Sequence, residues 1–306
     1  MSGPTSGPMS GNAIAVIGAF GQVAQALLRA GLARGQNIAI GGRPIVNLTS
    51  PASMDIFLEQ ARPAIIINAA AYTAVDKAES DSAAAYALNT EGPRYLAAWC
   101  ARRGVPLIQV STDYVFDGTA SRPYCEDDAR HPMSVYGRSK SDGEDAVRAA
   151  LASHIIVRTA WVYGPDGNNF LKTMLRLGAE RDVVRVVADQ TGTPTHADDI
   201  AGALLDIATA VTRGGQRPAW GTYHLVAGGT TTWHGFAEEI FAAAARAGLK
   251  VPKLEAITTA DYPTPAVRPR YSVLDTTRLR QTFGLSLPDW RMRVEPAVRA
   301  LANKAN

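Results

Sequence analysis

The sequence predicts an α/β protein: a doubly wound parallel sheet with a smaller, mixed α/β lobe in the C-terminal half. Short β-branched runs alternate with longer amphipathic stretches through the first half of the chain, which is typical of parallel strands covered by helices on both faces. A glycine-containing turn, Gly18-x-x-Gly21, joins the first such run to the first helical stretch. The second half contains Pro-rich and aromatic loops between helices, which favours a lobe that determines specificity.

The individual elements follow from this alternation. We expect strands at residues 13–17, 37–40, 64–68, 107–110 and 155–157, and a strand that returns to the main sheet at 223–225. Ser is a common helix N-cap and Pro is favoured at the first helical position, so a helix should begin at Ser50-Pro51. Further helices are expected at residues 22–33, at about 79–103 and around 136–140.

The composition excludes several classes of protein. The chain has 306 residues, 46% of them hydrophobic, and its 31 basic residues nearly balance 28 acidic ones for a net charge of +3. Without a dense Lys/Arg run we expect no nucleic-acid partner, and the mild positive excess suits small anionic ligands such as phosphates. No apolar run approaches the ~20 residues of a membrane helix. We therefore expect no membrane partner. Monomer and homodimer both stay open.

The cysteines and histidines predict no metal site. Cys100 and Cys125 belong to no CxxC or Cys/His cluster, and the five His residues show no metal-binding spacing. Two isolated thiols are typical of a reducing compartment. We therefore expect a cytoplasmic protein without a bound metal.

The turn after the first strand predicts a Rossmann-type dinucleotide site. Gly18 and Gly21 would let the backbone approach a pyrophosphate, and Ala24 replaces the third glycine of the motif, where a small residue suffices. The following helix offers N–H donors and the positive end of its dipole, and Gln22 and Val23 would add backbone contacts. An ordinary tight turn between a strand and a helix is the alternative.

The end of the second strand, Gly41-Gly42-Arg43, favours NADPH over NADH. NAD sites usually place an acidic residue here for the ribose 2′-hydroxyl, whereas an Arg accommodates the 2′-phosphate of NADP. No Asp or Glu stands between Gly31 and Met54. A solvated loop position for Arg43 is the alternative, and NADH stays open as a cofactor.

Two further segments are expected to line the cofactor. Asn47 and Leu48 follow Arg43 closely and would come near the adenine. The third strand ends in Asn68 and three alanines, among them Ala70 and Ala71. Side chains this small would let a cofactor lie against the edge of the sheet.

These features divide the chain into domains. Residues 1–12, rich in Gly, Ser and Pro, are expected to form a disordered tail. Residues 13–160 are expected to form the NAD(P)-binding Rossmann domain, with return segments at about 195–227. Residues 161–194 and 228–306 are left for the substrate-binding lobe.

A Tyr/Lys pair beside a hydroxyl pair predicts the chemistry. Tyr136 and Lys140 are four residues apart, which places them on one face of a helix. A free Tyr titrates near pH ~10, and lowering its pKa by about three units takes roughly 4 kcal/mol of phenolate stabilisation. The Lys140 ammonium and an oxidised nicotinamide can supply this. Tyr136 would donate its proton to a carbonyl oxygen as hydride arrives at the carbon, and Lys140 would also hold the nicotinamide ribose.

The strand end adds Ser111 and Thr112. Adjacent strand residues point to opposite faces, so only one hydroxyl can face the substrate. We expect Thr112 to hydrogen-bond the reacting oxygen and Ser111 to support the site; capping of the strand end is the alternative for Thr112. Trp161 follows a strand at the same edge of the sheet, where stacking on a sugar ring and plain core packing both stay open.

Linked motifs resemble the extended short-chain dehydrogenase/reductases, and within them the dTDP-4-dehydrorhamnose reductases. The resemblance runs from about Ala13 to about Trp290. Each motif is weak alone, but their order and number are specific. They lie at residues 18–23, 68–79, 111–118, 136–140, 158–164, 167–170, 189–195 and 262–269.

The resemblance implies reduction of the 4-keto group of dTDP-4-dehydro-L-rhamnose by NAD(P)H to dTDP-L-rhamnose, a sugar donor for surface polysaccharides such as lipopolysaccharide. Tyr136 would be the proton donor, Lys140 its partner and Thr112 the neighbour that tunes its pKa. The implied sugar contacts are Val75, Thr112, Asp113, Tyr136 and Trp161. The implied cofactor contacts are Gly21, Gln22, Val23, Ala70, Ala71, Tyr72 and Ser111.

One family feature fits poorly. Some members look like dimers bridged by magnesium through surface carboxylates, and one of these carboxylates falls at Gln25, while Asp198 matches another. Loss of a carboxylate weakens a hard-cation site, so we expect no magnesium. A reductase or epimerase for another nucleotide-linked 4-keto-6-deoxysugar, and a reductase-like regulatory subunit without turnover, stay open as alternatives.

Overall fold

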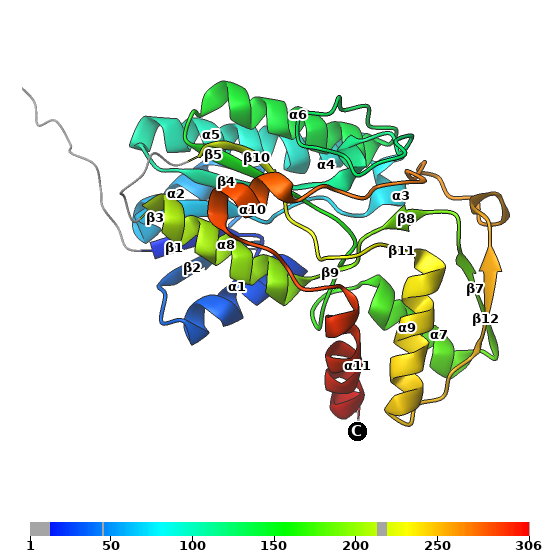
Figure 1. The fold of residues 1–306 in the computed structure, drawn as a ribbon. Coiled ribbons are helices and arrows are strands. Elements are labelled where there is room, and N and C mark those ends of the chain that lie inside the picture. Colours follow the sequence, from blue (N-terminus) through cyan, green and yellow to red (C-terminus); the bar gives the residue numbers. More distant parts are fainter. Residues whose placement is uncertain (1–12, 45, 213–218, 306) are drawn as a thin grey trace, which may run out of the picture.

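The computed structural model describes residues 13–44, 46–212 and 219–305 (Figure 1). A six-stranded sheet with strand order β10-β5-β4-β3-β1-β2 forms its centre, and every neighbouring pair in it is parallel. The strands are β1 Ala13–Ile17, β2 Ile38–Gly41, β3 Pro63–Asn68, β4 Leu107–Thr112, β5 His154–Thr159 and β10 Gly221–His224. The predicted α/β fold class is confirmed, and β10 is the expected returning strand.

Helices cover both faces of this sheet (Figure 1). One face carries α1 (Gln22–Ala33) and α8 (Ala197–Thr212), and the other carries α2 (Pro51–Ala61), α5 (Gly92–Arg103) and α6 (Val135–Ala150). Successive residues of β1 point to opposite faces: Ile14 and Val16 pack on the α1/α8 side, Ala15 and Ile17 on the other. The unbroken apolar runs of the sequence are explained by this two-sided burial, which is worth ~1.5–3 kcal/mol per large aliphatic side chain.

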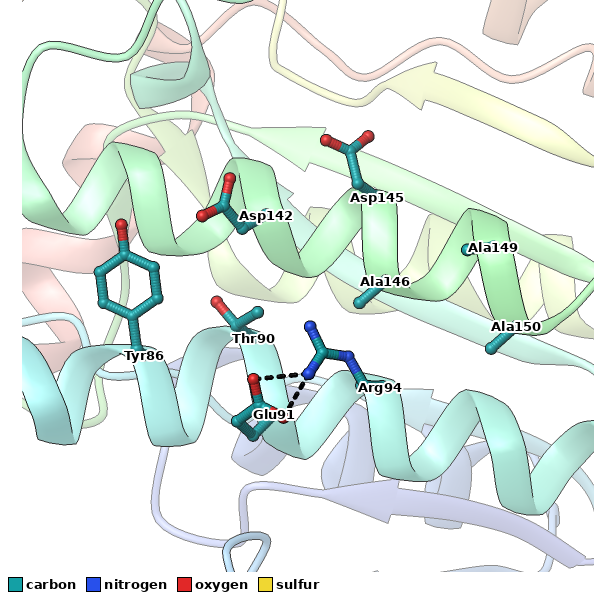
Figure 2. Close-up of a pocket in the computed structure, with 9 residues that line it drawn as sticks. All are labelled: Tyr86, Thr90, Glu91, Arg94, Asp142, Asp145, Ala146, Ala149 and Ala150. Carbon is teal, nitrogen blue, oxygen red and sulfur yellow. Dashed lines mark hydrogen bonds and ion pairs between the residues drawn. The ribbon is translucent and has the colours of Figure 1, made fainter.

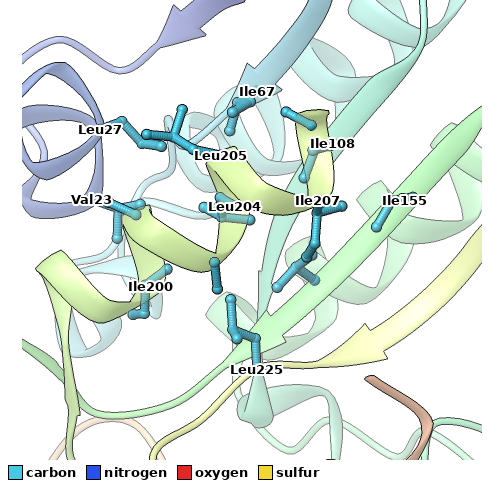
Figure 3. Close-up of a cluster of buried hydrophobic side chains, with 14 of the residues drawn as sticks. Val23, Leu27, Ile67, Ile108, Ile155, Ile200, Leu204, Leu205, Ile207 and Leu225 are labelled. Atoms are coloured by element: carbon cyan, nitrogen blue, oxygen red, sulfur yellow. The ribbon is translucent and has the colours of Figure 1, made fainter. Parts of the chain in front are cut away.

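The α1/α8 face shows how a return segment joins the first half of the chain (Figure 3). Ile200 and Leu204 of α8 lie in one buried cluster with Leu27 of α1 and with Ile108 and Ile155 of the sheet. These side chains are all buried. The segment around α8 therefore belongs structurally with the sheet, although it follows the first lobe segment in the chain.

The expected long helix at about 79–103 is interrupted. A short helix α3 (Val75–Ala78) ends in a turn, and helix α4 (Ser82–Tyr86) continues through a π-helical stretch (Ala87–Glu91) into α5. Within the π-helical stretch, the Asn89 Oδ1 accepts a hydrogen bond from the backbone N–H of Tyr72 at 2.8 Å. Local helix propensity gives no sign of such long-range contacts.

The second lobe packs around its own core. Tyr163, Phe236 and Trp290 are buried there between three helices, α7 (Phe170–Glu180), α9 (Trp233–Arg246) and α11 (Arg291–Ala305). A parallel pair, β7 (Val183–Val187) and β12 (Lys253–Ile257), flanks the helices. Two small ribbons complete the lobe: β6 (Val162–Tyr163) with β9 (Thr195–His196), and β8 (Thr191–Gly192) with β11 (Thr231–Thr232). Single-turn 3-10 helices span Asp113–Val115 and Thr259–Asp261.

The domain boundaries expected from the sequence stay a prediction. Helix α10 (Thr277–Phe283) lies within the range assigned to the lobe, yet its Leu279 is buried in the α1/α8 core of the sheet. The expected disordered tail, residues 1–12, lies outside the described residues. Among the residues that the structure describes, no helix combines the length and the apolar character needed to cross a membrane.

Candidate active site

The carboxyl ends of β1 and β3 form a switch point of the sheet. The chain leaves β1 toward β2 on one side and later returns to β3 on the other, and ligands of open parallel sheets bind where the strand order reverses in this way. Gly18 and Gly21 follow β1, and Ala70 follows β3. The predicted cofactor turn therefore lies at the expected edge.

Close backbone packing requires glycine at position 18. Gly18 has a φ of +115°, and a Cβ atom there would lie 2.8 Å from the backbone nitrogen of Ala70. The N–H of Gly21 donates to the Gly18 carbonyl at 2.8 Å, and Gly21 is the N-cap of α1. The N–H groups at the start of α1 thus follow a turn that has no side chain at positions 18 and 21, which fits a pyrophosphate.

Two residues of α1 were predicted to contact the cofactor: Gln22, which bridges to the second lobe, and Val23, which is buried. Gln22 Nε2 donates to the carbonyl of Val162 at 3.3 Å, and Gln22 Oε1 accepts from Asn169 Nδ2 at 3.0 Å. Gln22 thus ties the glycine turn to the second lobe. Val23 is buried in the core, so it can offer only its backbone to a ligand.

The residues after β2 are partly available to a ligand. Arg43 is exposed, and no ion pair joins its guanidinium to any residue that the structure describes. Asn47 Oδ1 is engaged with the N–H of Thr49 at 3.1 Å, and Leu48 is buried against Gly92. A free cation at the end of β2 fits a 2′-phosphate, while the Leu48 side chain serves the core.

Helix α6 docks on β4 through three consecutive strand residues. Lys140 Nζ donates to the carbonyl of Val110 at 2.7 Å, and Ser111 Oγ donates to Glu144 Oε1 at 2.6 Å. Beside them, the Thr112 side chain interacts with the Tyr136 hydroxyl and lowers its pKa. The helical partners are spaced by four residues, at positions 136, 140 and 144, so one face of α6 meets one strand end.

The start of α6 is secured by side chains. Ser134 is its N-cap and accepts from the N–H of Gly137 at 3.1 Å. The N–H of Val135 donates to Glu79 Oε1 at 2.8 Å. A cap of this kind stabilises a helix by about 1 kcal/mol, and it places Tyr136 in the first turn.

Burial sets the protonation of the Tyr/Lys pair. It raises the pKa of Tyr136 to about 12, against the hydrogen bond with Thr112, which lowers it. Burial also lowers the pKa of Lys140 to about 8, while the charge of Glu144 raises it. The lowering of the Tyr136 pKa that we expect from Lys140 and an oxidised nicotinamide stays a prediction, and Lys140 Nζ is directed at the Val110 carbonyl. At neutral pH Tyr136 keeps its proton and Lys140 is charged.

Asp113 is a buried carboxyl at the same strand end. Burial raises its pKa to about 6, against interactions with Ser272 and Thr112 that lower it. Its Oδ1 accepts from Thr112 Oγ1 at 2.9 Å, and its Oδ2 has no hydrogen-bond partner among the residues described in the structure. An unpaired buried oxygen suits a ligand hydroxyl.

Apolar and aromatic side chains surround this corner. Tyr72, Val75 and Tyr114 pack against Tyr136, with the Tyr114 and Tyr136 rings edge-on at 5.5 Å. Trp161 lies two residues beyond β5, and β5 pairs with β4 in the register Thr112–Thr159. The structure thus brings the predicted residues of β4, α3 and α6 together at one sheet edge.

The chain matches the family model described as RmlD substrate binding domain over residues 12–303. A dTDP-4-dehydrorhamnose reductase from Sinorhizobium fredii is 44% identical over 288 residues, which cover 94% of this chain and 97% of that protein. The chain belongs to the dTDP-4-dehydrorhamnose reductase family. The family predicted from the sequence motifs is confirmed.

Solved structures agree with this membership of the reductase family. A crystal structure of a dTDP-4-dehydrorhamnose reductase from Clostridium acetobutylicum has a TM-score of 0.87 and 37% identity, covering 94% of this chain and 99% of that one. A structure of the enzyme from Bacillus anthracis in complex with NADP has a TM-score of 0.86 and 34% identity, covering 94% of this chain and 98% of that one.

The magnesium site suggested by the family resemblance does not fit this chain. Gln25 donates its amide to the carbonyl of Ala19. The Asp198 carboxylate accepts from Arg29 Nη2 at 2.8 Å, and Arg29 also pairs with Asp166. A guanidinium thus occupies the carboxylates that a hard cation would need, and the described residues contain no group of three or more His, Cys, Asp or Glu that could hold a metal ion.

Two buried groups were not anticipated from the sequence. Glu144 binds Arg158 through two hydrogen bonds, at 2.9 and 2.8 Å. Burial alone would raise the pKa of Glu144, but Arg158 lowers it to about 2. Asn89 links Tyr72 to α6 by donating to Ser139 Oγ at 3.0 Å. The one signal for Asn89 in the sequence was its place as a polar residue in an Ala-rich stretch, which could have indicated a buried hydrogen bond.

An open groove lies between two helical segments of the first half of the chain (Figure 2). It has a volume of about 660 Å³ and runs between α6 and the helical segment from α4 to α5. Its floor is formed by alanines of α6, and Asp142 and Asp145 rise from the same helix. Neither Tyr136 nor Lys140 lines it, so the groove is separate from the catalytic corner.

Proposed function

We propose that the protein reduces the 4-keto group of dTDP-4-dehydro-L-rhamnose with NADPH and so produces dTDP-L-rhamnose. The observation that carries this is the packing of Tyr136 and Lys140 of α6 against the end of β4, beside Thr112, at the edge of the sheet that also holds the glycine turn. Membership of the reductase family supports the choice of substrate. The enzyme is an oxidoreductase, and a nucleotide sugar is its substrate.

The residues of the chain account for the proton transfer. Bound NADPH would supply the hydride that reaches C4 of the sugar. Tyr136, which is protonated at neutral pH, gives its proton to the 4-keto oxygen as negative charge develops there. Thr112 orients that oxygen, and the Lys140 ammonium stabilises the resulting phenolate and holds the nicotinamide ribose. The product is the sugar with a hydroxyl group at C4. Tyr136 then regains its proton from solvent.

The remaining predicted residues divide between cofactor and sugar. Arg43, free and exposed at the end of β2, binds the 2′-phosphate and makes NADPH the preferred cofactor over NADH. The Asp113 Oδ2, which has no partner among the described residues, accepts a hydrogen bond from a sugar hydroxyl. Val75 and Trp161 contact the sugar ring. The free thiols of Cys100 and Cys125 support a reducing, cytoplasmic location.

Steady-state turnover tests the proposal. The purified protein should oxidise one NADPH for each dTDP-4-dehydro-L-rhamnose reduced, and other nucleotide-linked 4-keto-6-deoxysugars should react more slowly. An epimerase would convert the sugar without net loss of NADPH, and a regulatory subunit would show no turnover. Either result would contradict the proposal.

Tyr136→Phe tests the proton donor. Removal of the hydroxyl should lower kcat by ~10²–10⁴-fold, the range of general acid catalysis, while the affinity for NADPH stays close to that of the wild type. Tyr95→Phe is the matched control, because Tyr95 lies on α5 outside the site and its hydroxyl contacts the Pro51 carbonyl. A Tyr136→Phe variant as active as the wild type would exclude this mechanism.

A further inference from the structure

We propose that Trp233 and Gly192 are positioning residues, which together hold the indole of Trp161 in a single orientation at the substrate end of the sheet. The inference rests on the proposed function, because it concerns how the sugar is oriented for reduction. Neither residue stood out in the sequence as part of the site. Three independent features of the structure converge on Trp161.

The first feature is the backbone of Trp161. Its φ is +45°, one of only two positive values among the non-glycine residues described in the structure. A bulky residue adopts this region only where its surroundings hold it there. Such a conformation at the end of a strand, beside a catalytic corner, calls for contacts that maintain it.

The second feature is a parallel stack of two indoles. The rings of Trp161 and Trp233 lie 3.5 Å apart between centroids, with an angle of 5° between their planes. Trp233 is the first residue of α9, whose N-cap Thr232 accepts from the N–H of Gly235 at 3.0 Å. One face of Trp161 is therefore covered by a residue fixed to a capped helix.

Trp233 is also anchored behind the stack. Its ring contacts Phe170 at 4.7 Å, and Phe170 stacks on the buried Phe236 at 5.4 Å. Phe236 lies in the core of the second lobe. The orientation of Trp161 is thus set by an aromatic chain that ends in a packed core rather than in solvent.

The third feature is the close approach of Gly192. A Cβ atom at this position would lie 2.5 Å from Cε2 of Trp161 and 2.7 Å from its Nε1. Gly192 belongs to β8, which pairs antiparallel with β11 in the register Thr231–Gly192, and β11 leads directly into Trp233. One short ribbon therefore places both constraints against the same indole.

Trp161 is only half-buried, so part of its indole stays accessible to a ligand. The indole follows β5, whose last residue is paired with Thr112 of β4. A fixed indole there limits the poses of a sugar whose keto group must reach Thr112 and Tyr136. Loss of the stack should misorient the sugar while leaving the glycine turn and Arg43 unchanged.

The decisive experiment compares kinetics of Trp233→Leu with the wild type. We expect kcat/KM for the keto sugar to fall by about 10- to 100-fold, the range for a misplaced substrate, with an unchanged KM for NADPH. Trp233→Phe should recover most of the loss, because it restores a ring to the stack. Gly192→Ala should reproduce the defect of Trp233→Leu.

A double variant separates positioning from an independent contact. Trp161→Leu combined with Trp233→Leu should be no worse than Trp161→Leu alone, since Trp233 acts through Trp161. Additive losses would overturn the inference, as would equal effects on the sugar and NADPH. Trp220→Leu is the matched control, because Trp220 is a half-buried tryptophan packed at the opposite edge of the sheet.

Circular dichroism supplies a readout that does not depend on turnover. Two parallel indoles in contact couple their transitions, so the wild type should show an exciton couplet that is lost in Trp161→Leu and in Trp233→Leu but kept in Trp220→Leu. If the wild type shows no couplet, the two indoles are not stacked and the inference is overturned. A wild type that shows the couplet but reduces no keto sugar contradicts the proposed function instead, so the two failures are distinguishable.

Discussion

The two halves of the candidate site are built in different ways. The cofactor half, around Gly18 and Gly21, depends on close backbone approach, and the exposed Arg43 lies at the end of the neighbouring strand. The catalytic half is a buried polar network in which β4 is bonded to α6 and, through Glu144, to Arg158. The first half therefore depends on open space beside the backbone, whereas the second depends on every hydrogen-bond partner being present.

Removal of Glu144 gives the largest expected effect on stability. Glu144→Ala leaves the Arg158 guanidinium buried without its carboxylate, and breaking a buried pair in this way costs ~3–5 kcal/mol. Urea unfolding followed by circular dichroism measures the loss. Glu91→Ala is the matched control, since the Glu91–Arg94 pair is exposed and should contribute ~0–1 kcal/mol. If both variants lost the same free energy of unfolding, the buried network would contribute no more to stability than an exposed ion pair, which would contradict the prediction.

Arg43 tests the charge at the end of β2 in the cofactor half. Arg43→Ala should raise KM for NADPH by ~10- to 100-fold, as expected for a hydrogen bond to a charged group worth about 1.5–3 kcal/mol. KM for NADH should not change, because NADH lacks the 2′-phosphate. Arg94→Ala is the control. A parallel rise of both KM values would mean that Arg43 does not read the phosphate.

Gly18→Ala tests whether the turn depends on empty space. The added Cβ would press on the backbone of Ala70, and a φ of +115° is unfavourable for alanine, so we expect a cost of ~1–3 kcal/mol and weaker NADPH binding. Gly35→Ala is the control, because Gly35 has a φ of +65° with nothing within 4 Å of the added atom. Gly35→Ala should lower the stability of the protein but leave its affinity for NADPH unchanged. Thermal unfolding measures the stability of both variants, and NADPH titration measures their affinity.

The pH dependence of the reaction gives the smallest effect. The pKa of Lys140 is lowered to about 8 and that of Tyr136 is raised to about 12, so Lys140 loses its proton first as pH rises. We expect kcat/KM to decline above pH 8, and Lys140→Arg to move this decline to higher pH while lowering the overall rate. An unmoved decline would assign the titration to another group.

Local patterns predicted the strands, the glycine turn and the spacing of Tyr136 and Lys140, because each depends on neighbours a few residues away. The choice between the two hydroxyls also followed from strand alternation. In the structure Thr112 lies beside Tyr136 and lowers its pKa, whereas Ser111 donates a hydrogen bond to Glu144. The direct contact of Ser111 with the cofactor stays a prediction.

Other features could not be inferred locally. The π-helical stretch, which interrupts the expected helix, places Asn89 in contact with Tyr72 and Ser139. The role of Trp161 stayed open between sugar stacking and core packing, and the structure shows that one of its faces is covered by Trp233. Each case involves a partner far along the chain that no periodicity identifies.

The amino-acid order by itself determined the parallel sheet, the Rossmann-type turn and the family, because apolar alternation, glycine spacing and motif order are all local properties. Only the tertiary structure decided how the catalytic side chains are held. Glu144 of α6 binds Ser111 of β4 and Arg158 of β5, and Trp233 of α9 covers Trp161, so these contacts join segments that are distant in the chain. Burial then sets their charges and orientations, since desolvation and packing exist only once those segments meet.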